Sequence, residues 1–523
     1  MIPDFDDIPS CVRRHAARAS HQPALVQGPR VLDYAALDAL MDRVAAALQR
    51  DGLGPGDTIA ICAGMSIDYA AVFLGALRAG VAVAPLAPGT GAEGLARMVS
   101  DAQARCVFVD AANAGMFERA TPARLACVML DGADGADGAE GSMSLALWLR
   151  DATDPPRAVD IQPQWPFNII YSSGTTGEPK GIVQSHGMRW THVRRGAAYG
   201  YGPDTVTLLS TPLYSNTTLV VFCPTIAHGG TVVLMAKFDA RGYLGLAQQH
   251  RVTHTMLVPV QYQRLMALPQ FDQFDLSSFQ VKFSTSAPFG AALKADVLAR
   301  WPGGLVEFYG MTEGGGTCIL EAHRFADKLH TVGLPAQGHD LRLIDDNGVE
   351  VTTGAAGEVV GHSGGMMTGY HGQPEKTREA EWFDPTGKRF IRTGDIGRFD
   401  EDGFLILLDR KKDMVISGGF NVYPSDLEAV LRQHAAVADV AVVGVASERW
   451  GETPVGFVVL RPGPSVPASE LLQWANAQLG KTQRLHDLQL CDELPRSAIG
   501  KVLKRELRAA YGQTPSNYQT PSA

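Results

Sequence analysis

The sequence lacks most of the features that mark secreted, zinc-bound and membrane-spanning proteins. Its 7 cysteines among 523 residues are odd in number, scattered and never spaced as Cys-x-x-Cys, which argues against a disulfide framework and a structural zinc site. The 14 histidines show no His-Glu-x-x-His spacing. The most apolar runs, Tyr69 to Leu77 and Leu219 to Ala227, are too short to span a bilayer. The acidic N-terminus has no basic region followed by an apolar core, so we expect no secretory signal and a cytoplasmic location.

Strong positive charge is also missing from the sequence. The net charge is -9, and the only dense basic cluster is Arg410-Lys411-Lys412, which argues against nucleic acid as a partner. With 45% hydrophobic and 19% charged residues, the chain is globular and too long for one core, so we expect at least two domains. A monomer and a homodimer both remain open.

Short β-branched runs alternate with helical patterns in the chain up to Tyr309, which predicts α/β layers with largely parallel strands. A helix is expected from Tyr34 to Leu53. The expected strands are Thr58 to Cys62, Val81 to Pro85, Cys106 to Asp110, Phe167 to Tyr171, Thr205 to Thr211, Thr231 to Ala236, His254 to Pro259, Val281 to Ser284 and Leu305 to Tyr309.

Beyond these runs the pattern changes. Glycine-rich turns around Gly354 to Glu358 indicate a smaller, strand-rich part. The last unit alternates a helix from Ser425 to Gln433, strands from Asp439 to Val445 and Pro454 to Leu460, and a helix from Ala468 to Leu479. We therefore expect a large N-terminal α/β domain over residues 1–408 with layered subdomains, a hinge over residues 409–412, and a small mobile α+β C-terminal domain over residues 413–523.

The most informative stretch runs from Tyr171 to Gly181, directly after the apolar residues 167–170, and is expected to be a loop that leaves a buried strand. Its glycines let backbone N–H groups converge on one oxyanion, its four hydroxyls add donors or Mg2+ contacts, and Lys180 adds positive charge. The indicated ligand is a polyphosphate. Because Pro179 precedes the lysine and Gly181 follows it, the run is not a Walker A loop. By composition alone, a solvated turn is the alternative.

Taken in order, the same residues resemble the signature loop of the acyl-adenylate-forming superfamily, which includes acyl-CoA synthetases, peptide-synthetase adenylation domains and luciferases. The resemblance implies that ATP phosphates are bound by Ser172, Ser173, Gly174, Thr175, Thr176, Gly177 and Lys180. It further implies a catalytic contribution from Thr176 and Lys180, and contact of Thr175 with Mg2+.

The run from Glu307 to Glu313 resembles a second signature of this superfamily. The resemblance implies that Tyr309 lies against the adenine, that Glu313 holds Mg2+ and acts in catalysis, and that the other nucleotide contacts are Glu307, Gly310 and Thr312. An aromatic face can stack on a purine, and a carboxylate is a hard oxygen ligand of the kind that Mg2+ prefers.

Three further motifs follow in the order that the superfamily has them. The resemblance implies that Asp395 accepts hydrogen bonds from both ribose hydroxyls, that Arg410 also contacts the ribose, and that Lys412 is the hinge. The loop formed by Ser417, Gly418 and Gly419 is implied to line the passage for coenzyme A. Lys501 is implied to contact the substrate carboxylate and the α-phosphate, where a cation is worth roughly 10²- to 10³-fold in rate.

The sequence departs from the superfamily in the acid pocket. Ser215 stands where many members have histidine, and Asn216 could supply the missing hydrogen bond. Glycines at positions 310 and 314–316 suggest open space, and Phe289 adds an apolar wall. The implied pocket residues are Tyr214, Ser215, Asn216, Ala287, Gly310 and Gly314. We expect an aromatic or medium-length aliphatic acid. Contacts to coenzyme A near residues 480–484 are not carried over.

The resemblance implies an acid–CoA ligase that uses ATP and Mg2+ and forms an acyl-AMP intermediate. The implied partners are therefore a small carboxylic acid, ATP and coenzyme A. Three alternatives stay open: an adenylation enzyme that loads a carrier-protein thiol, a luciferase-like oxygenase, and a nucleotide-binding protein without activity. Glu313 and Lys501 argue against the last, since binding alone needs neither.

Overall fold

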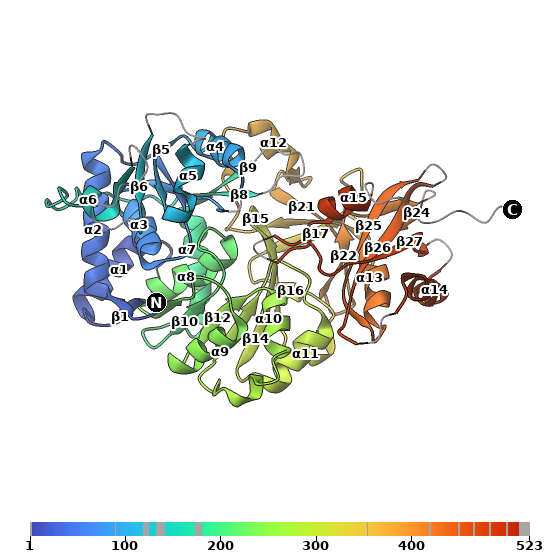
Figure 1. The fold of residues 1–523 in the computed structure, drawn as a ribbon. Coiled ribbons are helices and arrows are strands. Elements are labelled where there is room, and N and C mark those ends of the chain that lie inside the picture. Colours follow the sequence, from blue (N-terminus) through green and yellow to red (C-terminus); the bar gives the residue numbers. More distant parts are fainter. Residues whose placement is uncertain are drawn as a thin grey trace. The chain divides into compact units, whose positions relative to one another are not determined.

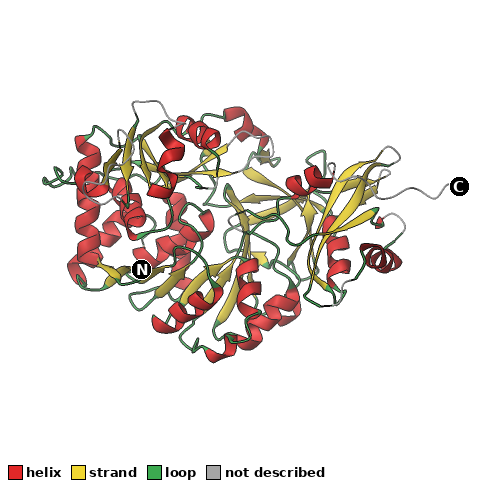
Figure 2. Ribbon diagram, viewed as in Figure 1, coloured by secondary structure: helices red, strands yellow, loops and turns green. Residues whose placement is uncertain are grey.

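The computed structural model describes residues 3–88, 90–118, 125–131, 142–172, 180–352, 354–417, 420–447, 450–463, 466–480, 483–497 and 500–511. The chain divides into two compact units: the N-terminal unit, residues 1–341 with 360–392, and the C-terminal unit, residues 342–359 with 393–523. Both contain helices and strands, and the larger one is N-terminal, which confirms the predicted α/β fold class (Figures 1 and 2).

The N-terminal unit contains a nine-stranded sheet with the order β16-β15-β14-β13-β12-β10-β11-β1-β2. The pairs from β1 through β11, β10, β12 and β13 to β14 are parallel, while β2, β15 and β16 are antiparallel to their neighbours. The strands are β1 (Pro23–Gln27), β2 (Arg30–Asp33), β10 (Val206–Leu209), β11 (Thr231–Leu234), β12 (His254–Leu257), β13 (Val281–Ser284), β14 (Gly304–Met311), β15 (Gly314–Glu321) and β16 (Leu334–Pro335).

A second sheet of eight strands has the order β19-β9-β8-β4-β3-β5-β6-β7. It is parallel from β8 to β7, and β9 is antiparallel to both β8 and β19. Every residue of β3 is buried, as a parallel strand covered on both faces requires. The strands are β3 (Thr58–Cys62), β4 (Ala82–Pro85), β5 (Ala104–Val109), β6 (Ala126–Met129), β7 (Ser142–Ser144), β8 (Pro166–Ser172), β9 (Lys180–Ser185) and β19 (Gly369–Tyr370).

Helices cover these sheets, and several begin at a side-chain cap. Asp33, Ser66, Ser185 and Ser215 each accept a hydrogen bond from a backbone N–H of the first turn of α2, α3, α7 and α8, respectively. Figure 1 shows α9, α10 and α11 grouped beside β12 and β14. The helices are α1 (Ile8–Arg18), α2 (Tyr34–Arg50), α3 (Ile67–Arg78), α4 (Ala92–Asp101), α5 (Ala111–Glu118), α6 (Leu145–Trp148), α7 (His186–Gly196), α8 (Asn216–Ala227), α9 (Ala240–Gln249), α10 (Pro259–Met266), α11 (Ala291–Arg300) and α12 (Pro374–Glu379).

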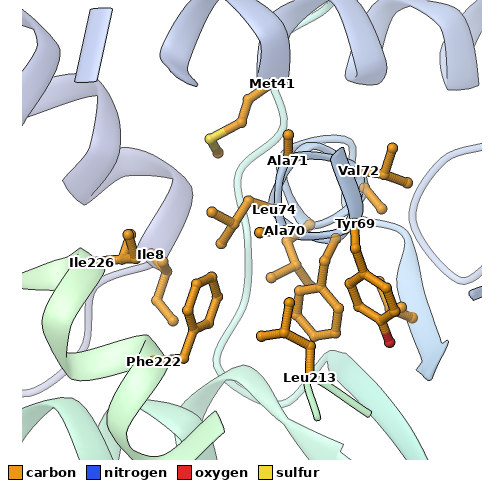
Figure 3. Close-up of a cluster of buried hydrophobic side chains, with 14 of the residues drawn as sticks. Ile8, Met41, Tyr69, Ala70, Ala71, Val72, Leu74, Leu213, Phe222 and Ile226 are labelled. Carbon is orange, nitrogen blue, oxygen red and sulfur yellow. The ribbon is translucent and has the colours of Figure 1, made fainter. Parts of the chain in front are cut away.

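The largest core cluster joins helices that lie far apart in the sequence. Ile8 of α1, Met41 of α2, Leu74 of α3 and Phe222 of α8 are at most 2% exposed and point toward one another (Figure 3). Burying side chains of this size is worth about 1.5–3 kcal/mol each. The two apolar runs of the sequence are therefore core helices, and no helix among the described residues has the length and hydropathy to cross a bilayer.

The C-terminal unit has its own sheet, with the order β24-β23-β26-β25 and β27 paired with β26. The chain passes between the units within β17 (Asp340–Ile344), β18 (Gly357–His362) and β21 (Arg389–Phe399). These strands form a further sheet with β20 (Glu381–Phe383) and β22 (Leu405–Arg410). The other elements are β23 (Val415–Ser417), β24 (Phe420–Val422), α13 (Pro424–Arg432), β25 (Val437–Ser447), β26 (Gly451–Leu460), α14 (Ala468–Gln478), β27 (Asp487–Leu490) and α15 (Lys504–Tyr511).

Each strand and helix that the sequence predicted is present, with ends shifted by at most a few residues. The division of the chain differs from the expected boundary at residue 408, because the C-terminal unit begins at Thr393 and also contains residues 342–359. The reason is that β21 continues unbroken across residues 392 and 393 and pairs with β22 only after that point.

Candidate active site

Strands β8 and β9 flank the stretch with the predicted phosphate contacts. They are antiparallel neighbours, with Tyr171 opposite Gly181 and the backbone of Ser172 opposite Lys180. The predicted contacts that lie outside the described residues are Ser173, Gly174, Thr175, Thr176 and Gly177. For Ser172 the structure describes only the backbone. Their role stays a prediction, whereas Lys180 can be placed.

Tyr370, which the sequence analysis did not single out, joins two of the predicted site residues. Its hydroxyl donates a 2.9 Å hydrogen bond to Glu313 Oε1, and Lys180 Nζ lies 5.2 Å from the centre of its ring. The ring is 9% exposed and packs against Ile182 and Met367. Burial, followed by the Glu313 carboxylate, raises the pKa of Tyr370, so the phenol keeps its proton and remains a donor. Lys180 and Glu313 are thereby held around one aromatic ring.

Glu313 is a half-buried carboxylate just after β14. Its carbonyl accepts a 2.8 Å hydrogen bond from the Met367 N–H, which fixes the backbone on the same segment that carries Tyr370. Among the described residues no three His, Cys, Asp or Glu side chains come close enough to hold a metal by themselves. A single carboxylate still fits Mg2+, because this ion commonly takes one or two protein carboxylates and completes its octahedron with phosphate oxygens and water.

The segments predicted to form the acid pocket follow β10, β13 and β14, which run parallel and so end at one edge of the sheet. Two hydrogen bonds hold them together. Thr217 Oγ1 and Ser286 Oγ are 2.6 Å apart, which joins the first turn of α8 to the loop after β13. Thr285 Oγ1 donates to the Phe308 carbonyl at 2.8 Å, which joins this loop to β14. Ser286 has a φ of 80°, a strained backbone angle for a residue with a side chain.

Ser215 and Asn216 occupy different environments in this corner. Ser215 is buried and caps α8, with its hydroxyl 3.2 Å from the Thr217 N–H. Its oxygen accepts this bond, and its role in the pocket stays a prediction. Asn216 is half-buried, and its Oδ1 accepts a 2.8 Å hydrogen bond from Arg189. Tyr214 and Ala287 are also half-buried, whereas Phe289 is stacked on Tyr262 with ring centres 5.1 Å apart.

The expectation of open space around the glycines is wrong for residues 314–316. A Cβ on Gly314 would lie 2.1 Å from the Gly365 carbonyl oxygen, and one on Gly316 would lie 2.4 Å from Leu341 Cγ. Gly314 and Gly315 also have φ angles of 83° and 70°. These glycines allow a close approach of backbones and a tight turn. Only Gly310 has ordinary van der Waals surroundings, with Thr317 Oγ1 at 3.4 Å.

The other predicted nucleotide contacts of the N-terminal unit are spread along β14. Glu307 is buried, and its carboxylate forms an ion pair with Lys294 of α11. Burial raises the pKa of Glu307, and the Lys294 charge opposes this shift. The structure therefore explains Glu307 as a core residue. Tyr309 is 9% exposed at the end of the strand, and the Thr312 carbonyl accepts a 2.7 Å hydrogen bond from Gln184 Nε2.

In the C-terminal unit, the two predicted ribose contacts lie opposite each other. Asp395 on β21 pairs in register with Arg410 on β22, and Arg410 Nε is 3.0 Å from Asp395 Oδ1. The Asp395 backbone N–H donates to Thr393 Oγ1 at 3.0 Å, and Gly394 has a φ of 70°. The carboxylate is thus fixed at the end of a tight turn.

Lys501 belongs to the same unit and interacts electrostatically with these charges. Desolvation of the ammonium, followed by the like charges of Arg410 and Lys412, lowers the pKa of Lys501 to about 8, with Asp395 and Asp413 opposing. Lys412 itself is exposed by surface area, and desolvation of its ammonium, followed by the like charge of Arg410, lowers its pKa. The structure therefore brings together four predicted residues from three motifs.

The predicted coenzyme A loop is described only at its start. Ser417 ends β23 and pairs with Phe420, while Gly418 and Gly419 lie outside the described residues. Their contact with coenzyme A stays a prediction.

The AMP-binding enzyme family matches residues 12–371, and the AMP-binding enzyme C-terminal domain matches residues 426–501. The chain belongs to this AMP-binding enzyme family. It is an enzyme, an AMP-forming acid–thiol ligase of the acyl-CoA synthetase type. Its two matched segments lie on either side of the Asp395–Arg410 pair.

Relatives of this AMP-binding enzyme span almost the whole chain. A feruloyl-CoA synthase of Amycolatopsis sp is 32% identical over 507 residues, covering 95% of this chain and 98% of that protein. A fatty acid–[acyl-carrier-protein] ligase, ScoC of Streptomyces coeruleorubidus, is 30% identical over 509 residues and covers 95% of each chain. The crystal structure of ATP-bound MatB from Rhodopseudomonas palustris has a TM-score of 0.84 at 28% identity, covering 97% of this chain and 99% of that chain.

Two residues of this AMP-binding enzyme were missed in the sequence. Tyr370 has a local signal, because Gly369-Tyr370 followed by Pro374 marks a short strand and then a helix start. Arg189 lies in α7, whose many basic and polar residues predict a solvated face. In the structure Arg189 is 1% exposed.

Proposed function

We propose that this enzyme joins an aromatic or medium-chain carboxylic acid to coenzyme A in two steps that use MgATP. In the first, the acid carboxylate attacks the α-phosphorus of ATP, which forms an acyl-AMP and releases pyrophosphate. In the second, the coenzyme A thiolate attacks the acyl carbonyl, which forms the thioester and releases AMP. The observation that supports this most is the contact of Tyr370 with both Lys180 and Glu313, since it groups a phosphate-binding cation with a metal-binding carboxylate.

The first step requires positioning and neutralisation of phosphate charge. Lys180 neutralises the charge of the phosphates. Tyr370 keeps the Lys180 ammonium beside Glu313. The adenine lies against Tyr309, next to Gly310 and Thr312. The other phosphate contacts are Ser172, Ser173, Gly174, Thr175, Thr176 and Gly177.

Mg2+ fits the donor set on this side of the site. Glu313 supplies one carboxylate, and its Tyr370 hydrogen bond occupies Oε1 only. Thr175 adds a hydroxyl. When bound, the ion neutralises the charge that builds up on the phosphate oxygens of the leaving pyrophosphate.

The C-terminal unit supplies the ribose contacts and the cation of the first step. Asp395 accepts hydrogen bonds from both ribose hydroxyls, and Arg410 holds that carboxylate in place. Lys501 contacts the acid carboxylate and the α-phosphate, so it offsets the repulsion between two anions that must meet. By analogy with the loss of one oxyanion donor, its removal costs roughly 10²- to 10³-fold in rate.

The second step needs room for a thiol that the first step excludes. A hinge at Lys412 rotates the C-terminal residues, withdraws Lys501 and brings Ser417, Gly418 and Gly419 to the passage for the pantetheine arm. Glycine suits this passage because it lets a narrow chain pass close to the backbone.

The half-buried Tyr214 and Ala287 support an aromatic or medium-chain acid, as does the relative named for feruloyl-CoA. A second candidate function is transfer to a carrier-protein thiol, which the relative named as a carrier-protein ligase favours. The two differ only in the acceptor of the second step.

The test is pyrophosphate and AMP release with ferulate, benzoate, octanoate and acetate, each with coenzyme A, with a phosphopantetheinyl carrier protein, or with neither. We expect turnover with ferulate, benzoate or octanoate only when coenzyme A is present. Turnover that needs the carrier protein selects the second function. No acid-dependent pyrophosphate release with any of the four acids contradicts both.

A further inference from the structure

Arg189 lies at the centre of a buried polar network in the N-terminal unit. Its Nε donates to Asn168 Oδ1 at 3.0 Å, its Nη1 donates to Asn216 Oδ1 at 2.8 Å, and its Nη2 donates to Gln184 Oε1. Asn168 Nδ2 donates to the same Gln184 oxygen at 3.0 Å. The network therefore joins β8, β9, α7 and the first residue of α8.

No carboxylate lies within ion-pair distance of Arg189 among the described residues, although its side chain is only 1% exposed. Two buried cations of this unit are paired with carboxylates, Lys294 with Glu307 and Arg78 with Asp38, whereas the buried Lys282 donates to the backbone carbonyls of residues 301–303. Burial lowers the pKa of Arg189 to about 10, so the group stays charged near pH 7. A buried charge that meets only neutral amides and the Phe167 ring, 5.7 Å away, is costly, and an anion next to the network would compensate it.

The network also fixes the orientation of the Asn216 amide. An arginine can only donate, so the atom that faces Arg189 must be the Asn216 oxygen. Gln184 Nε2 approaches the same oxygen at 3.4 Å. The Asn216 Nδ2 amino group consequently points away from the network, and the residue is half-buried.

Asn216 lies in the corner where the acid is expected. Asn216 follows Ser215, which stands in place of the histidine of many relatives. The next residue, Thr217, contacts Ser286 at 2.6 Å. Gln184, the neighbour of Asn216 in the network, holds the Thr312 carbonyl at 2.7 Å, one residue before Glu313. The network thus touches both the acid corner and the segment with the metal carboxylate.

We propose that the Asn216 Nδ2 group donates a hydrogen bond to a carboxylate oxygen of the acid, and that Arg189 is a positioning residue that orients this amide and offsets the charge of the bound acid. The proposal rests on the acid–thiol ligase function above. It assigns to Asn216 the polar contact that the histidine of many relatives makes, whereas the Ser215 oxygen accepts a hydrogen bond from the Thr217 N–H at the start of α8.

Asn216→Asp separates a binding role from a structural one. The substitution keeps the shape of the side chain and places a carboxylate against Arg189, so the fold is retained or stabilised. It removes the Nδ2 donor and presents a negative charge to the acid. We expect the KM for the acid to rise about 10- to 150-fold, the range for a lost hydrogen bond to a charged group, with the KM for ATP unchanged.

Arg189→Lys keeps the positive charge but loses the planar guanidinium that orients the Asn216 amide. The KM for the acid should therefore rise, while the KM for ATP stays unchanged. The control is Thr225→Val, which removes a buried hydroxyl of the same helix, 2.7 Å from Thr207 Oγ1, outside the network. It leaves the KM for the acid unchanged.

These variants are assayed by pyrophosphate release with ferulate, benzoate and octanoate, together with thermal unfolding. An Asn216→Asp protein with unchanged or higher Tm and an unchanged KM for the acid overturns the proposal. Equal loss for acid and ATP also overturns it, since that marks a general defect. If the unsubstituted protein turns over none of the acids, the proposed function fails first, and this inference falls with it.

Discussion

Tyr370→Phe removes one hydroxyl and keeps the ring, so it isolates the hydrogen bond to Glu313 from the contact with Lys180. The aromatic ring, whose centre is 5.2 Å from Lys180 Nζ, remains beside that ammonium and still packs against Ile182. The Glu313 carboxylate loses its 2.9 Å partner and can rotate. The substitution therefore tests whether the position of Glu313 matters for the reaction.

The expected magnitude follows from the type of bond. A hydrogen bond to a charged group contributes about 1.5–3 kcal/mol. If that energy is lost in the transition state, kcat/KM for MgATP falls roughly 10- to 150-fold, because 1.36 kcal/mol is tenfold in rate. The Mg2+ concentration for half-maximal rate rises as well, since a mobile carboxylate is a poorer ligand.

The assay is pyrophosphate release at varied Mg2+ with ATP and acid fixed. Tyr34→Phe is the matched control, because the buried Tyr34 hydroxyl donates to the Gly230 carbonyl at 2.8 Å, among the core helices. It should lower stability with unchanged Mg2+ dependence. A Tyr370→Phe protein with the Mg2+ and ATP dependence of the unsubstituted enzyme would refute the role given to this contact.

Three further predictions concern charged groups. Lys501→Ala should abolish acyl-AMP formation yet spare thioester formation from supplied acyl-AMP, and equal loss of both half-reactions in stopped assays would contradict its assigned role. Lys501 is charged below its pKa of about 8, so kcat/KM for ATP should be constant below that pH and fall above it. Lys501→Arg should move this fall in kcat/KM to higher pH. A fall at the same pH in the variant assigns the titration to another group. Lys294→Met leaves the Glu307 carboxylate buried and unpaired, so the free energy of unfolding in urea should fall by about 3–5 kcal/mol. Adding Glu307→Gln should restore part of this stability. An unchanged urea midpoint would show that the pair does not stabilise the fold.

Most of the fold could be predicted from the sequence because its strands are buried on both faces. Such strands are continuous apolar runs, as in Thr58–Cys62, and the polar residues at their ends stand out. The motifs after β8 and β14 stand out in this way, whereas Asp395 lies within β21 and was indicated by the resemblance of its short motif. The sequence does not predict how these motifs lie relative to one another, because β8, β14 and β21 belong to three different sheets.

The residues that sequence reasoning missed depend on contacts between distant segments. Tyr370 and Glu313 are 57 positions apart, and no local pattern links them. Arg189 belongs to a helix with a polar composition, and its burial follows only from packing against β8 and α8. The close approach of Gly314 to Gly365 likewise needs the partner backbone.

The central claim is that the acid carboxylate attacks the α-phosphorus of ATP. The most direct test uses an acid labelled with ¹⁸O in both carboxylate oxygens, with mass spectrometry of the products after turnover with coenzyme A. The account predicts one ¹⁸O in each AMP and none in pyrophosphate, because one carboxylate oxygen becomes the bridge of the acyl-AMP and leaves with AMP. Unlabelled AMP, or formation of ADP and labelled phosphate, would contradict it.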